Sequence, residues 1–157
     1  FYARVWYALR GFDPLLPFFV ESESRKIVSL AVPDALLSRM RADSSVIMVE
    51  MPDAARVQLL LEEYGFFAQQ LERFCGHLDT LVELRGKETV ARWKTWAAEG
   101  RWPEVFEQMM REHYDPLYLR SMKRNFAGIG AARQLALPDG QAASMRDAAR
   151  QLLPEPR

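Results

Sequence analysis

The chain has 157 residues, of which 49% are hydrophobic and 27% charged, an ordinary balance for one folded domain with a real core. Its 21 Lys and Arg are matched by 21 Asp and Glu, so binding to RNA would need a local basic patch. The one cysteine excludes an internal disulfide and is typical of a reducing compartment, and no apolar run has membrane-spanning length. We therefore expect a cytoplasmic protein.

The first quarter of the chain predicts a helix followed by a strand. Residues 2–10 space their apolar side chains as a helix does, and Gly11 ends the segment. Because Phe1 already lies inside this periodic segment, we expect the chain to be part of a longer protein. The short apolar run after Pro17 predicts a buried strand over residues 17–21.

Two Pro-Asp pairs then predict helix starts around a second strand. Proline fits the first helical turn, and an early aspartate complements the helix dipole, so helices are expected from Pro33-Asp34 and from Pro52-Asp53. Residues 45–51 between them are typical of a second buried strand. This alternation predicts an α/β fold with a parallel sheet.

After residue 53 the pattern is almost wholly helical. One apolar stripe runs from Val57 to Leu81 with an expected break at Gly65, and Gly86 and Gly100 separate further helices. A last firm helix is expected to begin at Asp115-Pro116, with Asp115 as its N-cap. From residue 128 we expect a loose tail with a short helix near 142–152.

The end of the first predicted strand carries the densest chemistry of the sequence. Side chains at the carboxyl end of a strand in an α/β sheet line the crevice where ligands bind. An acidic residue there, Glu21 or Glu23, is placed to hold magnesium or its waters, and Ser24, Arg25 and Lys26 would face a phosphate. Taken alone, these residues fit a solvated strand end with local ion pairs better.

Other cations suggest a wider basic pocket. Arg56 lies one turn into the helix after the second strand, and Arg39 and Arg41 lie on the preceding helix. With Arg25 and Lys26 they could bind a diphosphate or an RNA backbone. A solvated helix face explains Arg39 better, and for Arg56 the two interpretations stand equal.

The remaining candidates have structural explanations. Cys75 lies on the apolar stripe, where an inert buried thiol is expected, and one Cys with two His is too few ligands for a structural zinc site. His113 is expected to be a packed imidazole at a helix junction rather than a catalytic group. The tryptophans near the middle of the chain are expected in the core or at a subunit interface rather than stacking on nucleobases: Trp93, Trp96 and Trp102.

Four ordered segments resemble the bacterial tRNA 2-selenouridine synthase family. The first is Phe18-Phe19-Val20-Glu21-Ser22-Glu23-Ser24-Arg25-Lys26-Ile27, which is similar to the family's V-E-[DS]-E-S-R-x-I. The second, from Val32 to Arg41, resembles L-P-x-x-L-x-x-R-M, and the third, from Arg56 to Tyr64, resembles R-x-x-x-L-x-x-x-Y. The fourth is His113-Tyr114-Asp115-Pro116-Leu117-Tyr118, which resembles Y-Y-D-P-x-Y. Val28 departs from the glycine expected there.

The resemblance implies an enzyme of two parts, a rhodanese-like domain with a reactive cysteine and then a P-loop domain. This chain would be the C-terminal half of that P-loop domain, with residues 1–52 as its α/β portion, 53–127 as its helical portion and 128–157 as the tail. The implied fold is predominantly helical α/β, with a partial P-loop NTPase-like parallel sheet and a C-terminal helical bundle. The missing N-terminal portions would be its partners, and the fragment alone is expected to be inactive.

The resemblance also implies a reaction and its substrates. The family converts wobble 2-thiouridine of tRNA to 2-selenouridine through a geranylated intermediate, with selenophosphate and geranyl diphosphate as co-substrates and no membrane partner. Cations would stabilise the departing diphosphate, for which Ser24, Arg25, Lys26 and Arg56 are the candidates, and Glu21 or Glu23 would orient a metal or water. The candidates for tRNA binding are Arg39, Arg41, Lys123 and Arg124.

Two other functions stay open at this point. One is a fragment of a P-loop kinase-like phosphotransferase that acts on a small phosphorylated molecule; the sequence leaves open whether a nucleotide or magnesium is bound. The other is a helical RNA- or protein-binding module without catalysis. A phosphate loop and a rhodanese cysteine in the complete protein would favour the selenouridine synthase over both.

Overall fold

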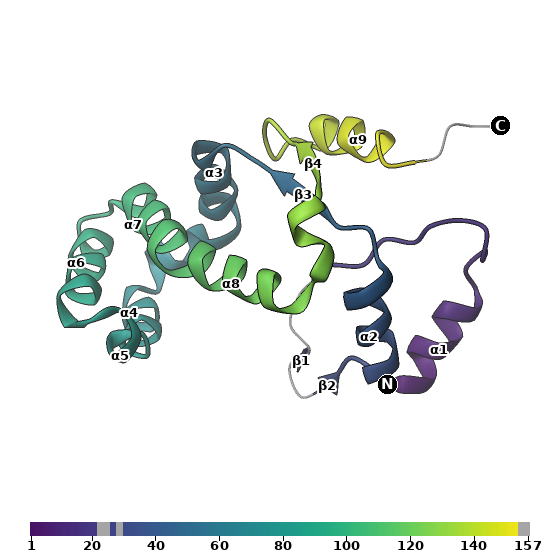
Figure 1. Ribbon diagram of the computed structural model, residues 1–157. Helices are drawn as coiled ribbons and strands as arrows, with labels where there is room; N and C mark the ends of the chain where they lie inside the picture. The colour runs from purple at the N-terminus through teal and green to yellow at the C-terminus, as the bar shows by residue number, and fades with distance from the viewer. Residues whose placement is uncertain (22–25, 28–29, 154–157) are drawn as a thin grey trace. The chain divides into compact units, whose positions relative to one another are not determined.

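The computed structural model describes residues 1–21, 26–27 and 30–153 (Figure 1). Contacts divide the chain into two units. The first comprises residues 1–46 and 121–132, and the second comprises residues 47–120 and 133–157. Most described residues are helical, as expected, and the parallel sheet is small. Within the described residues, no helix is both long and apolar enough to cross a membrane.

The first unit is built from short elements. Helix α1 spans Tyr2–Arg10 and ends at Gly11, and the two-residue strands β1 (Lys26–Ile27) and β2 (Leu30–Ala31) form an antiparallel pair. Helix α2 (Asp34–Asp43) begins directly after Pro33, as its Pro-Asp start predicts, and contacts the 3₁₀ helix η3 (Ala127–Ala131). Among the described residues, the first unit has three buried hydrophobic side chains, which are Leu37, Met122 and Phe126.

The predicted strand over residues 17–21 is wrong. These residues have no regular secondary structure, and Phe18, Phe19 and Val20 are 46%, 54% and 49% exposed. A strand must pair its backbone N–H and C=O groups, yet β1 and β2 pair with each other, and no strand among the described residues pairs with this run. The ring of Phe18 stacks on Phe12 instead, with centroids 5.1 Å apart.

The second unit contains the parallel sheet. Strand β3 (Ile47–Glu50) confirms that the second predicted segment is a strand, and it pairs with β4 (Arg133–Ala136) so that Ile47 lies opposite Arg133. It is not buried as predicted, since Val49 is 53% exposed. The backbone N–H of Leu137 extends the ladder by donating to the oxygen of Glu50 at 2.8 Å. A small buried cluster here contains Leu135, Leu137 and Ala148, the last of which belongs to helix α9 (Ala142–Arg150). The expected loose tail is therefore wrong for β4, whereas α9 matches the short helix predicted near its end.

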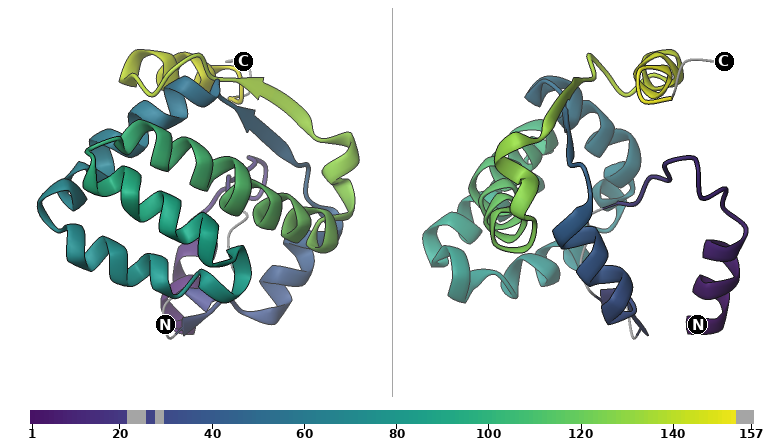
Figure 2. Two further views of the ribbon diagram at one scale, coloured as in Figure 1. Left: turned by 90° about the vertical axis from the view of Figure 1, so that its left-hand side faces the viewer. Right: turned by 45° about the vertical axis from the view of Figure 1, so that its right-hand side comes forward.

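Helices make up the rest of this unit (Figure 2). Helix α3 (Asp53–Tyr64) follows Pro52 and lies beside α7 (Trp102–Met109). Between them run η1 (Gly65–Gln69), α4 (Leu71–Asp79), α5 (Val82–Arg85) and α6 (Lys87–Ala98). The predicted breaks at Gly65, Gly86 and Gly100 are all present. Gly86 and Gly100 have φ of 85° and 75°, a conformation that favours glycine.

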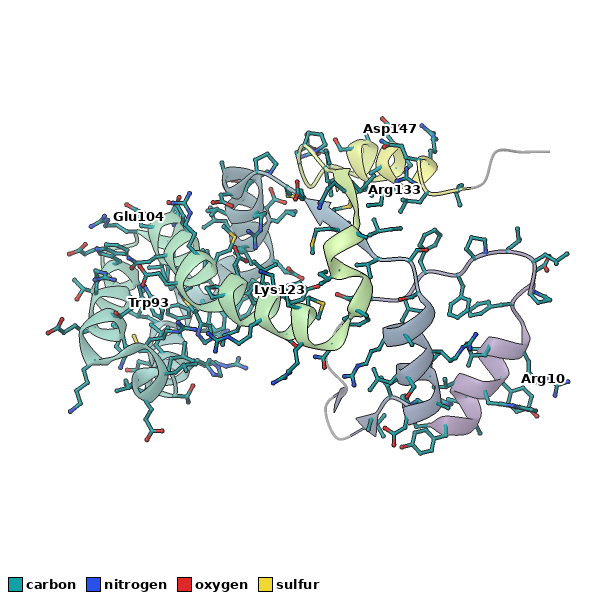
Figure 3. The ribbon with its side chains drawn as sticks, in the orientation of Figure 1. Arg10, Trp93, Glu104, Lys123, Arg133 and Asp147 are labelled. Carbon is teal, nitrogen blue, oxygen red and sulfur yellow. The ribbon has the colours of Figure 1, made fainter. Side chains whose placement is uncertain are left out.

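One main core stabilises these helices. Its buried side chains come from α4, α6 and α7 and include Phe74, Leu78, Trp93, Val105 and Phe106. Trp93, which is labelled in Figure 3, is fully buried. Its indole N–H donates to the side-chain oxygen of Gln108 at 2.7 Å. Trp96 and Trp102 pack against the same core. The structural interpretation of the three tryptophans is therefore confirmed.

Candidate functional site

The predicted strand-end site lies mostly outside the described residues. Glu21 is exposed and follows no strand, while Glu23, Ser24 and Arg25 are outside the described part of the chain. Lys26 begins β1, but its side chain is likewise outside the description. The proposed roles of these residues stay predictions.

Arg56 is held in a bidentate ion pair. Its two terminal nitrogens, Nη1 and Nη2, donate to Oδ2 and Oδ1 of Asp115 at 2.9 and 2.6 Å, and each of the two side chains is 29% exposed. This fork-to-carboxylate geometry is the strongest that Arg forms with an acid. The pKa of Arg56 is raised above its usual value, mainly by the hydrogen bond to Asp115, although partial burial opposes the shift. The pair joins α3 to the start of α8 (Asp115–Asn125).

Asp53 extends the pair into a network. Its Oδ1 lies 3.5 Å from Nη1 of Arg56, and its Oδ2 accepts from Nε of Arg111 at 2.9 Å. Arg111 also contacts Glu107 at 3.1 Å. The predicted diphosphate-binding Arg56 therefore already faces two carboxylates, and this geometry favours a structural role that connects helices.

Asp115 does not cap a helix as the sequence predicts. Helix α7 continues without a break through a π-helical turn, η2 (Met110–Tyr114), into α8, and Asp115 itself has helical φ and ψ of −59° and −45°. Pro116 has no N–H to donate to the preceding turn, and its ring would crowd a regular helix there. A π turn relieves such crowding by inserting one residue. The Asp115 carboxylate is thereby free to pair with Arg56.

His113 lies in the π turn and is fixed by Arg85. The Arg85 Nε donates to Nδ1 of His113 at 2.9 Å, and Nη2 donates to the His113 backbone oxygen at 3.3 Å. Because Arg keeps its protons, Nδ1 must be the acceptor, which places the proton of neutral His113 on Nε2. Burial, followed by the charge of Arg85, lowers the pKa of His113 below its ordinary value. This supports the packed imidazole that the sequence predicts.

Tyr114 and Tyr118 form a stacked aromatic pair that the sequence analysis did not single out. Their centroids lie 5.6 Å apart with an interplanar angle of 14°. Tyr114 is 53% exposed, whereas Met110 at the start of the same π turn is 4% exposed. Because residues four apart are neighbours on a helix surface, the spacing of the two tyrosines in the sequence could have predicted this contact.

The predicted tRNA-binding cations all belong to the first unit. Arg39, Lys123 and Arg124 are exposed, and Arg41 is half-buried with its Nε unpaired among the described residues. This unit has eight Lys and Arg against five Asp and Glu, a formal charge of +3, and the second unit has −3. The zero net charge of the chain is therefore the sum of a basic first unit and an acidic second unit.

The described residues do not assemble a metal site. They contain no group of three or more His, Cys, Asp or Glu placed to hold a cation. The open hollow between Trp96, Glu104, Gln108 and Arg111 also includes Glu107 and Glu112, so its carboxylates would repel a phosphate. Cys75 is half-buried and takes part in no disulfide.

Comparison with known proteins supports the family resemblance. Residues 10–81 match the family model described as the tRNA 2-selenouridine synthase AAA domain. The match contains the first three of the four motifs, while the segment from His113 to Tyr118 lies beyond it. Comparisons with curated proteins and with solved structures give no match. The resemblance inferred from the motifs is therefore confirmed over residues 10–81.

Proposed function

We propose that this chain is part of a tRNA-modifying enzyme that converts wobble 2-thiouridine to 2-selenouridine through a geranylated intermediate. The observation that carries the proposal is the family match over residues 10–81, together with the order of the motifs within it. Selenophosphate would donate selenium, and geranyl diphosphate would donate the prenyl group.

The geranyl transfer needs a concentration of positive charge. The sulfur of 2-thiouridine forms a bond to the first carbon of the geranyl chain while the bond from that carbon to the diphosphate oxygen breaks. Fixed cations accelerate such a step because they stabilise the charge that develops on the departing diphosphate. Ser24, Arg25 and Lys26 are the proposed ligands, with Glu21 or Glu23 orienting a water.

Arg56 has a more restricted role in this proposal. Its two terminal nitrogens already donate to Asp115, so a diphosphate could reach it only by sharing the guanidinium. A structural role that connects α3 to α8 fits this geometry best, and phosphate binding by Arg56 stays a prediction.

The positive charge of the first unit supports tRNA as the partner. Phosphate contacts by Lys and Arg supply most of the affinity of proteins for nucleic acids. Lys123 and Arg124 form no ion pair with described residues, so they can neutralise RNA phosphates without breaking an existing contact. Arg39 and Arg41 are the further candidates on α2.

The test is mass spectrometry of nucleosides from 2-thiouridine tRNA incubated with the complete protein, geranyl diphosphate and selenophosphate. We expect geranylated and then selenium-containing uridine. Arg25→Gln should reduce geranyl transfer sharply, whereas the matched Arg150→Gln, an exposed arginine of α9, should not. A folded, tRNA-binding protein that yields no modified nucleoside would favour a binding module without catalysis. Normal turnover in Arg25→Gln would overturn the role of that residue alone.

A further inference from the structure

We propose that residues 1–20 form a surface that binds an anionic lipid membrane from one side, without crossing it. The surface combines helix α1 with the apolar segment over residues 12–20 that follows it, and both belong to the first unit. The family resemblance implies no membrane partner, so this inference goes beyond the proposed function and does not depend on it.

Residues 1–20 are the most apolar exposed stretch of the described chain. They contribute ten of the twenty exposed large hydrophobic side chains: Phe1, Tyr2, Trp6, Tyr7, Phe12, Leu15, Leu16, Phe18, Phe19 and Val20. Helix α1 has no buried residue, and no strand among the described residues pairs with residues 12–20. Apolar side chains gathered on a surface to this degree mark a contact with a protein or a membrane.

The pattern of α1 favours a membrane surface. Tyr2, Val5, Trp6 and Leu9 share one side of the helix, since residues three and four apart are neighbours. Tyr2, Trp6 and Tyr7 are 60%, 53% and 70% exposed. Trp and Tyr are the side chains that proteins concentrate between lipid headgroups and hydrocarbon, because each joins an apolar ring to a polar N–H or O–H.

The charges of α1 are complementary to an anionic surface. Arg4 and Arg10 are its only charged side chains, and both are exposed without an ion pair among the described residues. The guanidinium carbon of Arg10 lies 4.7 Å from the centre of the Trp6 ring, so this cation flanks the apolar side of the helix. Asp13 is the one acid of the stretch, and its carboxylate already accepts a backbone N–H. A helix with apolar aromatic residues on one side and only cations as charges is typical of binding to anionic lipids.

The segment after α1 presents apolar side chains on a turn that satisfies its own backbone. The backbone N–H of Leu15 donates to the carboxylate of Asp13 at 2.9 Å, and that of Leu16 donates to the Asp13 carbonyl at 3.1 Å. Leu15 is 89% exposed and Leu16 55%. The ring of Phe18 stacks on Phe12 across this turn, with centroids 5.1 Å apart. Because the turn N–H groups are already paired, moving the two leucines into lipid costs less backbone desolvation.

The experiment measures flotation of the 157-residue chain with vesicles of phosphatidylcholine mixed with phosphatidylglycerol, and with vesicles of phosphatidylcholine alone. We expect the anionic vesicles to bind more tightly, and added salt to weaken this binding. Arg4→Gln and Arg10→Gln should each weaken it roughly fivefold. Leu16→Gln should weaken it roughly tenfold, because the leucine loses its burial in lipid. The matched control is Leu84→Gln in α5, where the wild-type side chain is also 55% exposed, and it should bind as the wild type.

Trp6 provides a spectroscopic readout of the same contact. Of the four tryptophans of the chain, Trp93 is buried and Trp96 and Trp102 pack against the main core, whereas Trp6 is exposed. The fluorescence of the wild type should therefore shift to shorter wavelength on anionic vesicles and be quenched by brominated lipid. Trp6→Phe should still float with the vesicles but lose both fluorescence changes.

Three outcomes would overturn the proposal. If Leu16→Gln floats as well as the wild type, or Leu84→Gln is equally weakened, residues 1–20 are not the membrane contact. If the 157-residue chain binds vesicles but the complete protein does not, another part of that protein covers this surface. If the chain does not float and light scattering shows a dimer that Leu16→Gln dissociates, the surface binds a second copy. The nucleoside assay of the proposed function is unaffected by any of these results, so the two proposals fail separately.

Discussion

The two units of this chain stabilise themselves in different ways. Of the fifteen buried hydrophobic side chains among the described residues, twelve belong to the second unit and three to the first. The first unit instead contributes eleven of the twenty large hydrophobic side chains that are exposed, ten of them within residues 1–20. The second unit therefore has a core of its own, and the first presents most of its apolar groups to solvent.

Several cations of the second unit differ from two cations of the first. In the second unit, Arg56, Lys94, Arg101 and Arg111 are all paired with carboxylates. In the first unit, Lys123 and Arg124 are exposed and have no such partner among the described residues. A paired cation mainly connects elements of a fold, whereas an unpaired one is available to an anionic ligand. Whether a cation is paired or unpaired therefore separates candidates for a structural role from candidates for ligand binding, and this criterion does not depend on the family resemblance.

The largest expected effect concerns the core. Trp93→Ala removes a fully buried ring and leaves Gln108 without its indole donor, so it should lower the free energy of unfolding by about 3–5 kcal/mol. The matched Trp6→Ala, in which the wild-type ring is 53% exposed in α1, should cost less than about 1 kcal/mol. Urea denaturation followed by circular dichroism measures both. Equal losses would mean that the first unit also depends on a tryptophan core.

The second prediction sets a paired cation against an unpaired one. Arg56→Gln should reduce stability by about 1–3 kcal/mol, because it leaves a half-buried Asp115 carboxylate without its main donor. In a double-mutant cycle with Asp115→Asn, the losses of the two single variants should not add, and the difference measures the coupling energy between the two residues. Lys123→Gln should change stability by less than about 0.5 kcal/mol. If Arg56→Gln leaves stability unchanged but abolishes geranyl transfer in the complete protein, Arg56 is a ligand-binding residue after all.

Local signals predicted most of the helices. Pro-Asp pairs placed the starts of α2 and α3, and glycines placed the breaks at Gly86 and Gly100, because each effect depends on one or two neighbouring residues. Strand β4 was missed because Arg133-Gln134-Leu135-Ala136 has no β-branched residue. Its partner β3 is also far away in the sequence.

The candidate site was less predictable. Arg56 and Asp115 are 59 residues apart, and no pattern within either segment reports that they meet. Asp115-Pro116 has the form of a helix start, yet the π turn lets the helix run through it. The stack of Tyr114 and Tyr118 was accessible from their spacing, but its exposure depends on which face the helix buries. Such features follow from tertiary packing, which overrides the local signal.

The smallest expected effect is a pH dependence of the second unit. The pKa of His113 is lowered in the folded protein, because burial and the charge of Arg85 disfavour its protonated form, whereas the unfolded chain keeps the ordinary value of 6.5. The unfolded state therefore binds more protons below that value, and His113 should reduce stability as the pH falls through 6.5 towards the folded pKa. The midpoint of thermal unfolding, followed from about pH 7.5 to 5, should fall more steeply in the wild type than in His113→Gln. Gln can still accept a hydrogen bond from Arg85 but does not titrate. Parallel curves for the two proteins would mean that the pKa of His113 is not lowered in the folded protein, so that solvent screens the charge of Arg85 at the π turn.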